Sequence, residues 1–177
     1  LPEFPRHLVV VGGGYIACEF ASIFRGLGAQ VTQLYRGEQV LRGFDDDVRN
    51  FLAAEMRKKG VDLRTNSDVS RIERDAQQRL RVTLRDGSSL QADNVLFATG
   101  RQPNTAGLGL AEAGVQLATN GAVVVDEHYR SNVASIHALG DVIDRMQLTP
   151  VALAEAMALV DRLFGEGVAF RVERAGA

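Results

Sequence analysis

The hydrophobic pattern at the start of the chain predicts a strand, a tight turn, a helix and a second strand. The run HLVVV at residues 7–11 is typical of a buried strand. Residues 15–27 carry apolar side chains at three- and four-residue spacing, and Gly28 is a natural stop for the resulting helix. The recurring positions are Ile16, Phe20, Ile23, Phe24 and Leu27. With a strand at 29–35, the segment has the length of a right-handed crossover.

The next pattern predicts a second helix and a small antiparallel sheet. Asp45 is placed as an N-cap and Gly60 as a C-terminal stop, with an apolar face formed by Val48, Phe51, Leu52 and Met56. A strand follows at 61–64. Residues 69–73 and 80–84 alternate apolar and polar side chains, and Asp86-Gly87 is a strong turn signal. An apolar strand at 95–98 then returns to the main sheet, so we expect an antiparallel meander inserted in a parallel one.

The remainder of the chain has a weaker pattern. Residues 101–120 are rich in glycine and asparagine and predict irregular structure. We expect strands at 122–126 and 135–139 and an alanine-rich helix at 151–164. The composition changes near Asp126, which predicts a domain boundary there.

Composition narrows the function classes. The chain has 177 residues, 46% of them hydrophobic and 24% charged, which is typical of a globular protein. A net charge of -2 and a pI near 5.9 favour neither nucleic acid nor an anionic membrane as a partner. No apolar run is long enough to span a bilayer, and the first residues lack a signal-peptide pattern. Because Cys18 is the only cysteine, we expect no disulfide within the chain, no cysteine metal cluster, and a reducing cytoplasmic location.

The glycine-rich turn carries the clearest chemistry. Gly12, Gly14 and Ala17 match the pattern G-x-G-x-x-G/A between a strand and a helix. Gly12 permits the tight turn, Gly14 lets the backbone approach a pyrophosphate, and Ala17 lets the helix pack close to the strand. The helix N-terminus supplies amide donors to the phosphates. The sequence therefore predicts an α/β, Rossmann-like dinucleotide-binding domain, whose parallel sheet is crossed by a three-stranded antiparallel meander.

The end of the second strand indicates which dinucleotide binds. A site for an unphosphorylated ribose usually has an acid there, whereas this chain has Tyr35-Arg36 and, further on, Arg42. Guanidinium groups can clamp a 2′-phosphate that a carboxylate would repel. The two arginines are alternatively solvated surface residues, and Glu38 weakens the case. We favour NADP over NAD.

Four ordered motifs resemble a known family. VVVGGGYIACEFASIF, YRGEQVLRGFD, VLFATGRQPN and ALGDVIDRMQLTPVAL are similar to segments of the pyridine nucleotide-disulfide oxidoreductases of the glutathione reductase type. The resemblance covers about residues 1–165, and LRGFD and QLTPVAL are typical of the glutathione and trypanothione reductase branch. It implies the FAD/NAD(P)-binding form of the fold. It also implies an NADPH-dependent flavoprotein that reduces a small-molecule disulfide, and among such disulfides it favours glutathione disulfide.

The resemblance also implies cofactor-binding residues. For NADP these are Gly12, Gly13, Gly14, Tyr15 as an aromatic lid over the nicotinamide pocket, Ile16, Glu19, Arg36, Arg42 and Gly100. For FAD they are Asp141 and, where flavin and nicotinamide meet, Gln147 and Thr149. No residue of this chain matches a catalytic or metal-binding position.

Several of these residues also have a purely structural interpretation. Glu19 is alternatively a solvated helix residue and Tyr15 a cover for the start of its helix. Asp141 follows a glycine and is alternatively a turn residue. Thr149 precedes a proline, so we expect it to cap the last helix as well. We interpret Cys18 as a packing residue.

The resemblance implies that this chain is only part of an enzyme. The redox-active cysteine pair, the glycine loop for the FAD adenosine and the domain that forms a homodimer are expected outside it. We expect an NADPH domain at residues 1–125, a trailing part of the FAD domain at 126–167 and a tail of unknown role at 168–177. Alone, the chain is not expected to turn over.

Other functions stay open. One is another disulfide reductase of the same fold: trypanothione-like, mercuric or dihydrolipoyl dehydrogenase. A second is a standalone nucleotide-binding module without catalysis. A 2-hydroxyacid dehydrogenase is disfavoured, because the three histidines, His7, His128 and His137, lie in no recognisable catalytic setting.

Overall fold

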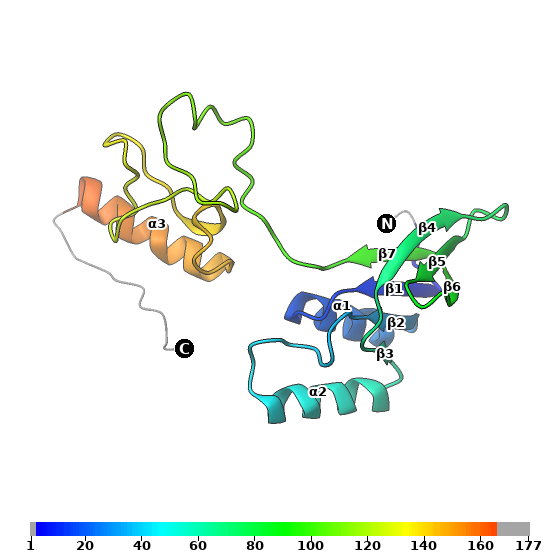
Figure 1. Cartoon of the computed structure of the whole chain (residues 1–177). Coiled ribbons are helices and arrows are strands. Elements are labelled where there is room, and N and C mark those ends of the chain that lie inside the picture. The colour runs from blue at the N-terminus through cyan, green and yellow to red at the C-terminus, as the bar shows by residue number, and fades with distance from the viewer. Residues whose placement is uncertain (1–2, 166–177) are drawn as a thin grey trace. The chain divides into compact units, whose positions relative to one another are not determined.

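Four parallel strands form the central sheet of residues 1–100 (Figure 1). The computed structural model describes residues 3–165. The sheet has the order β3-β2-β1-β7, and its strands are β1 (His7–Val11), β2 (Gln30–Leu34), β3 (Asp62–Arg64) and β7 (Asn94–Phe97). The chain moves from β1 to β2 and β3 on one side and later to β7 on the other. The carboxyl ends of β1 and β7 therefore form a topological switch point, where open α/β sheets bind ligands.

Two different layers cover the faces of this sheet. On one face, the helices α1 (Tyr15–Gly26) and α2 (Asp46–Lys58) bury a cluster with the strands. On the other, Val9, Val11 and Leu34 pack against Val82 and Leu84 of an antiparallel sheet. That sheet consists of β4 (Val69–Arg74), β5 (Leu80–Leu84) and β6 (Ser89–Ala92) (Figure 1). The predicted fold class, with its three-stranded meander, is confirmed.

The expected helix ends are also confirmed. The Asp45 carboxylate accepts hydrogen bonds from the amides of Asp47 and Val48 at the start of α2, as an N-cap does. Gly28 follows α1 with φ +100°, and Gly60 follows α2 with φ +90°. Positive φ is readily adopted by glycine, so both helices end at the residue that the sequence indicated.

The expected buried faces of both helices are wrong in detail. On α1 the buried residues are Ala17, Cys18 and Ala21, while Phe20 and Ile23 are 41% and 52% exposed. On α2 they are Ala53 and the expected Met56, and the expected Leu52 packs against the same core, while the expected Val48 and Phe51 are exposed. The buried side chains of α1 are all small, and small side chains let a helix pack close to a strand.

The second compact unit begins at Arg101 and has little regular structure. It contains the 3₁₀ helix η1 (Gly140–Ile143) and the helix α3 (Thr149–Phe164). The strands expected at 122–126 and 135–139 are not present; within residues 101–165 the structure has the isolated bridges Leu117 to Val123 and Arg130 to His137. Val123 is buried in a small cluster around loops, and Val125, Ile136 and Leu139 are partly buried against it. Burial of a short apolar run therefore did not imply a strand.

The units divide after Gly100. This division does not test the boundary expected near Asp126 between the NADPH domain and the FAD domain, which stays a prediction. The tail at 168–177 lies outside the described residues. Among the described helices, none has both the length and the apolar character to cross a membrane.

Candidate dinucleotide-binding site

A pocket of about 450 Å³ lies at the switch point of the sheet. The glycine loop after β1, the end of β2 and the end of β7 contribute to its wall. Five predicted site residues line it together: Gly12, Gly13, Gly14, Arg36 and Arg42. The sequence reasoning missed other lining residues, among them Tyr35, Ser67, Asp68, Phe97 and Thr99. The usable signal was topological, since residues that follow neighbouring parallel strands meet at one edge of the sheet.

Each glycine of the loop is glycine for a different reason. Gly12 has φ +143°, and a Cβ there would lie 2.2 Å from the carbonyl oxygen of Ala98. A Cβ on Gly13 would lie 2.5 Å from the ring of Tyr35. A Cβ on Gly14 would meet no protein atom within 4 Å. Packing therefore explains the first two glycines, whereas no contact among the described residues requires a glycine at position 14.

The carbonyls of Gly12, Gly13 and Gly14 accept hydrogen bonds within the protein, whereas the amides that follow Gly12 stay open. The carbonyl of Gly12 accepts a hydrogen bond from the Gln33 side chain at 3.0 Å. The carbonyl of Gly13 accepts one from the Leu41 amide at 2.6 Å, and that of Gly14 accepts one from the Cys18 amide at 3.1 Å. Within residues 3–165 no acceptor is bonded to the amides of Gly13, Gly14 or Tyr15. These donors stand at the N-terminus of α1, where the helix dipole adds positive potential. Such an arrangement binds phosphate.

Arg36 and Arg42 add two positive charges to the same pocket. Both are exposed. In the described part of the chain neither guanidinium has an ion-pair or hydrogen-bond partner, although eight pairs of another Arg or Lys with an Asp or Glu form there. Both cations are thus available to an anion that enters the pocket.

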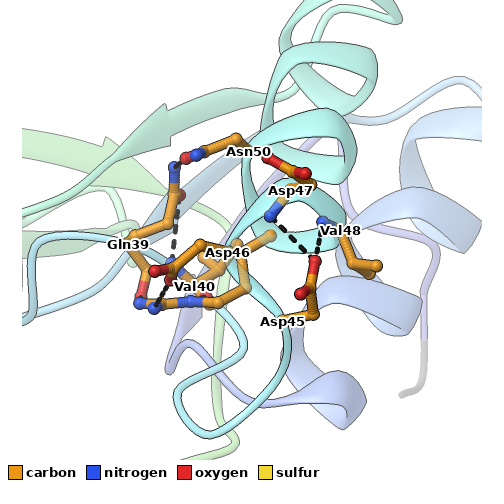
Figure 2. Close-up of polar contacts among 8 residues, drawn as sticks. Gln39, Val40, Asp45, Asp46, Asp47, Val48 and Asn50 are labelled. Atoms are coloured by element: carbon orange, nitrogen blue, oxygen red, sulfur yellow. Dashed lines mark hydrogen bonds and ion pairs between the residues drawn. The ribbon is translucent and has the colours of Figure 1, made fainter.

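The loop that carries the arginines is tied to α2. The Gln39 amide donates to the Asn50 side chain at 2.8 Å, and Asp45 caps the helix (Figure 2). The Arg49 guanidinium donates to the carbonyls of Val40 and Gln39 at 2.9 and 3.1 Å. These bonds fix the backbone on both sides of Arg42, while its own side chain stays open to solvent.

Tyr35 stands where an acid would select an unphosphorylated ribose. Its ring is half-buried and lies against the α-carbons of Gly13 and Gly37, where a Cβ would approach it to 2.5 and 2.7 Å. The ring therefore packs between the glycine loop and the loop that carries Arg36 and Arg42. The one carboxylate among the residues that line the pocket is Asp68, which pairs with Arg85 at 2.7 Å.

Three predicted residues lie on the first turns of α1, outside the pocket wall. Tyr15 is 40% exposed, Ile16 is half-buried and Glu19 is exposed. Gly100 follows the lining residue Thr99, with φ +129°. The roles expected for these four residues stay predictions.

The residues expected at FAD lie in the second unit. Asp141 pairs with Arg101 at 2.8 Å, and the Gln147 amide donates to Asp144 at 2.7 Å. The capping role of Thr149 is wrong. The amide of Ala152 donates to the carbonyl of Leu148, so Leu148 is the N-cap and Thr149 already lies in the first turn. The contacts of Asp141, Gln147 and Thr149 with FAD stay predictions.

Cys18 has the environment of a structural thiol. It is 4% exposed, and burial raises the pKa of the thiol above its ordinary value. The protonated thiol is a poor nucleophile, so Cys18 is not suited to sulfur exchange. Among the described residues no group of three or more His, Cys, Asp or Glu is placed to hold a metal ion.

Comparison with known proteins identifies similar sequences. The family model described as pyridine nucleotide-disulphide oxidoreductase matches residues 1–156. A glutathione reductase from Burkholderia cepacia is 52% identical over 165 residues, which cover 93% of this chain and 36% of that protein. A trypanothione reductase from Trypanosoma congolense is 44% identical over 168 residues, covering 93% of this chain and 34% of that protein. The chain thus spans about a third of the length of these curated relatives.

Solved structures agree with the sequence matches. The HOCl-induced flavoprotein disulfide reductase RclA from Escherichia coli superposes with a TM-score of 0.87 and 38% identity. The match covers 94% of this chain and 38% of that one.

Proposed function

We propose that this chain, which belongs to the pyridine nucleotide-disulphide oxidoreductase family, binds NADPH in the pocket at the ends of β1 and β7. One observation carries the proposal: Arg36 and Arg42 stand without partners in the wall that also holds the open amides of the glycine loop. The pocket thus offers two separate places for anions. An NADPH molecule has anions of both kinds, a pyrophosphate and a 2′-phosphate.

Each part of the pocket suits one part of this cofactor. The amides of Gly13 and Gly14 and the start of α1 would hold the pyrophosphate. The guanidinium groups would hold the 2′-phosphate through charge-assisted hydrogen bonds. Tyr35 replaces the carboxylate that would repel that phosphate, and Asp68 is already neutralised by Arg85. These features favour NADPH over NADH.

We further propose that the chain is the NADPH-binding part of a flavin-dependent disulfide reductase. FAD would supply electron transfer between NADPH and a disulfide. The exposed Asp141 and Thr149 and the half-buried Gln147 have polar groups suited to hydrogen bonds with FAD. The buried Cys18 is the chain's only cysteine, so the redox-active pair is proposed to lie in other segments of the enzyme, as is the homodimer interface.

Glutathione disulfide is the proposed substrate. The identity of 52% with a glutathione reductase supports it, against 44% with a trypanothione reductase.

A displacement assay tests the NADPH pocket. Fluorescent NADPH is bound to the chain and then challenged with 2′,5′-ADP or with 5′-AMP. We expect 2′,5′-ADP to displace NADPH at much lower concentration, because only it carries a 2′-phosphate. Equal displacement by the two nucleotides would reject the 2′-phosphate site.

A turnover assay tests the substrate. The complete reading frame that encodes this chain is expressed, and NADPH oxidation is followed with glutathione disulfide, trypanothione disulfide or lipoamide. Fastest oxidation with glutathione disulfide is the expected result. Preference for another disulfide would assign the protein to another branch, and NADPH binding without any disulfide-dependent oxidation would indicate a binding module.

A further inference from the structure

Gln33 is a fully buried polar residue behind the glycine loop. It lies in β2 and is 0% exposed. Its amide nitrogen donates to the carbonyl of Gly12 at 3.0 Å and lies 3.6 Å from the sulfur of Cys18. Because the carbonyl can only accept, the nitrogen of the Gln33 amide must face it.

The other end of the Gln33 amide has no partner. Its oxygen is the one buried side-chain polar atom, among the described residues, without a hydrogen bond. An unsatisfied buried carbonyl destabilises a fold, and a methionine of similar size would avoid that cost. Stability alone therefore does not explain a glutamine at this position.

The bond to Gly12 controls the direction of a neighbouring amide. The carbonyl of Gly12 and the N–H of Gly13 belong to one planar peptide group and point in opposite directions. When Gln33 draws the carbonyl toward β2, the N–H of Gly13 turns toward the pocket. Glycine has an unusually free backbone, so this peptide plane needs an external restraint. The amide of Gly12 is held in turn by the carbonyl of Leu34 at 2.9 Å.

We propose that Gln33 is a positioning residue for the dinucleotide pyrophosphate. Its side chain fixes the peptide plane between Gly12 and Gly13 and so presents the Gly13 amide to the phosphate, without touching the ligand. The inference rests on the proposed NADPH site. It adds a residue that the glycine pattern does not contain and that comes from the neighbouring strand.

Two ligands separate positioning from general support of the fold. NADPH carries a pyrophosphate, whereas 2′-AMP carries only the phosphate expected at Arg36 and Arg42. We expect Gln33→Met to weaken NADPH binding about tenfold, as loss of one hydrogen bond to a charged group does. Binding of 2′-AMP should stay within about twofold of the native value.

Thr32→Val is the matched control on the same strand. Thr32 is 1% exposed, and its hydroxyl bonds to His7 and Asp62 rather than to the loop. This variant loses partly buried hydrogen bonds that do not reach the loop, so both ligands should bind as they do to the native chain. Thermal unfolding of each variant shows whether it is folded.

Gln33→Glu supplies a second readout, which also serves if Gln33→Met does not fold. A protonated carboxyl can donate to the Gly12 carbonyl, and an ionised one cannot. Relative to the native chain, NADPH binding to Gln33→Glu should weaken as the pH rises from about 5 to about 8. Native-like NADPH binding at a pH where titration shows this carboxyl to be ionised would overturn the inference.

The remaining outcomes are distinct. Unchanged NADPH binding by Gln33→Met would overturn the inference and leave the NADPH site intact. Equal losses for NADPH and 2′-AMP would overturn it as well, because they would indicate a general defect. If the native chain binds 2′-AMP but not NADPH, or neither, the proposed function itself fails.

Discussion

Replacing Arg36 and Arg42 together by methionine is the most informative perturbation of the pocket. Methionine keeps much of the side-chain length but removes both charges. Neither guanidinium has a partner among the described residues, so the replacement breaks no ion pair and the fold should keep its stability. Any loss of NADPH binding can then be attributed to lost contacts between the two arginines and NADPH.

The expected size of the effect follows from the geometry. A hydrogen bond to a charged group contributes about 1.5–3 kcal/mol. Because both arginines are exposed, solvent screening places each near the lower limit. The pair should therefore contribute about 3 kcal/mol, which is roughly a hundredfold in Kd for NADPH. NADH, which lacks the 2′-phosphate, should bind with little change.

Isothermal titration calorimetry measures both Kd values. The matched control is a double replacement of Arg6 and Arg81 by methionine. These arginines are exposed, lie outside the pocket wall and have guanidinium groups without described partners, so the control changes the net charge equally. At about 1 M salt the Debye length is only about 3 Å, so the native preference for NADPH should shrink. Equal losses for NADPH and NADH in the Arg36 and Arg42 variant would refute the assignment.

Three further predictions concern the loop, the helix and the thiol. Gly14→Ala should keep its thermal stability but bind NADPH poorly in a fluorescence titration, and native-like NADPH affinity in this variant would contradict the role given to Gly14. Gly12→Ala should lose about 2–3 kcal/mol of unfolding free energy in chemical denaturation, because its Cβ would clash with a backbone carbonyl. Asp45→Ala should cost about 1 kcal/mol, and Asp45→Asn should restore most of it; equal losses would show that the cap bond is unimportant. Because burial raises the pKa of Cys18 above its ordinary value, the folded chain holds the thiol proton more tightly than the unfolded chain. The contribution of this thiol to stability should be constant below about pH 9 and fall above it, and Cys18→Val should lack this component in denaturation curves measured across that range.

The chain pattern was sufficient for the parallel sheet and for much of the pocket. Gly28, Asp45 and Gly60 end or begin helices through local chemistry that the sequence displays directly. The glycine loop and the two arginines were found because each has a residue type that phosphate recognition requires. These features depend on neighbours in sequence.

Features that depend on neighbours in space were not predicted. Gln33 is polar within a strand, and nothing in the sequence shows that it reaches Gly12. Tyr35 was noted only as a missing acid, although its ring packs on two glycines. The expected strands at 122–126 and 135–139 are wrong, because most of their apolar residues pack, partly buried, against a cluster formed by loops and need no partner strand there.

The central claim is that this pocket selects a phosphorylated dinucleotide. Calorimetric titration of the native chain with NADPH and then with NADH tests it directly. We predict tighter binding of NADPH, with a preference that falls as salt is added, because it rests on two exposed charges. Equal affinities, or tighter binding of NADH, would contradict the account.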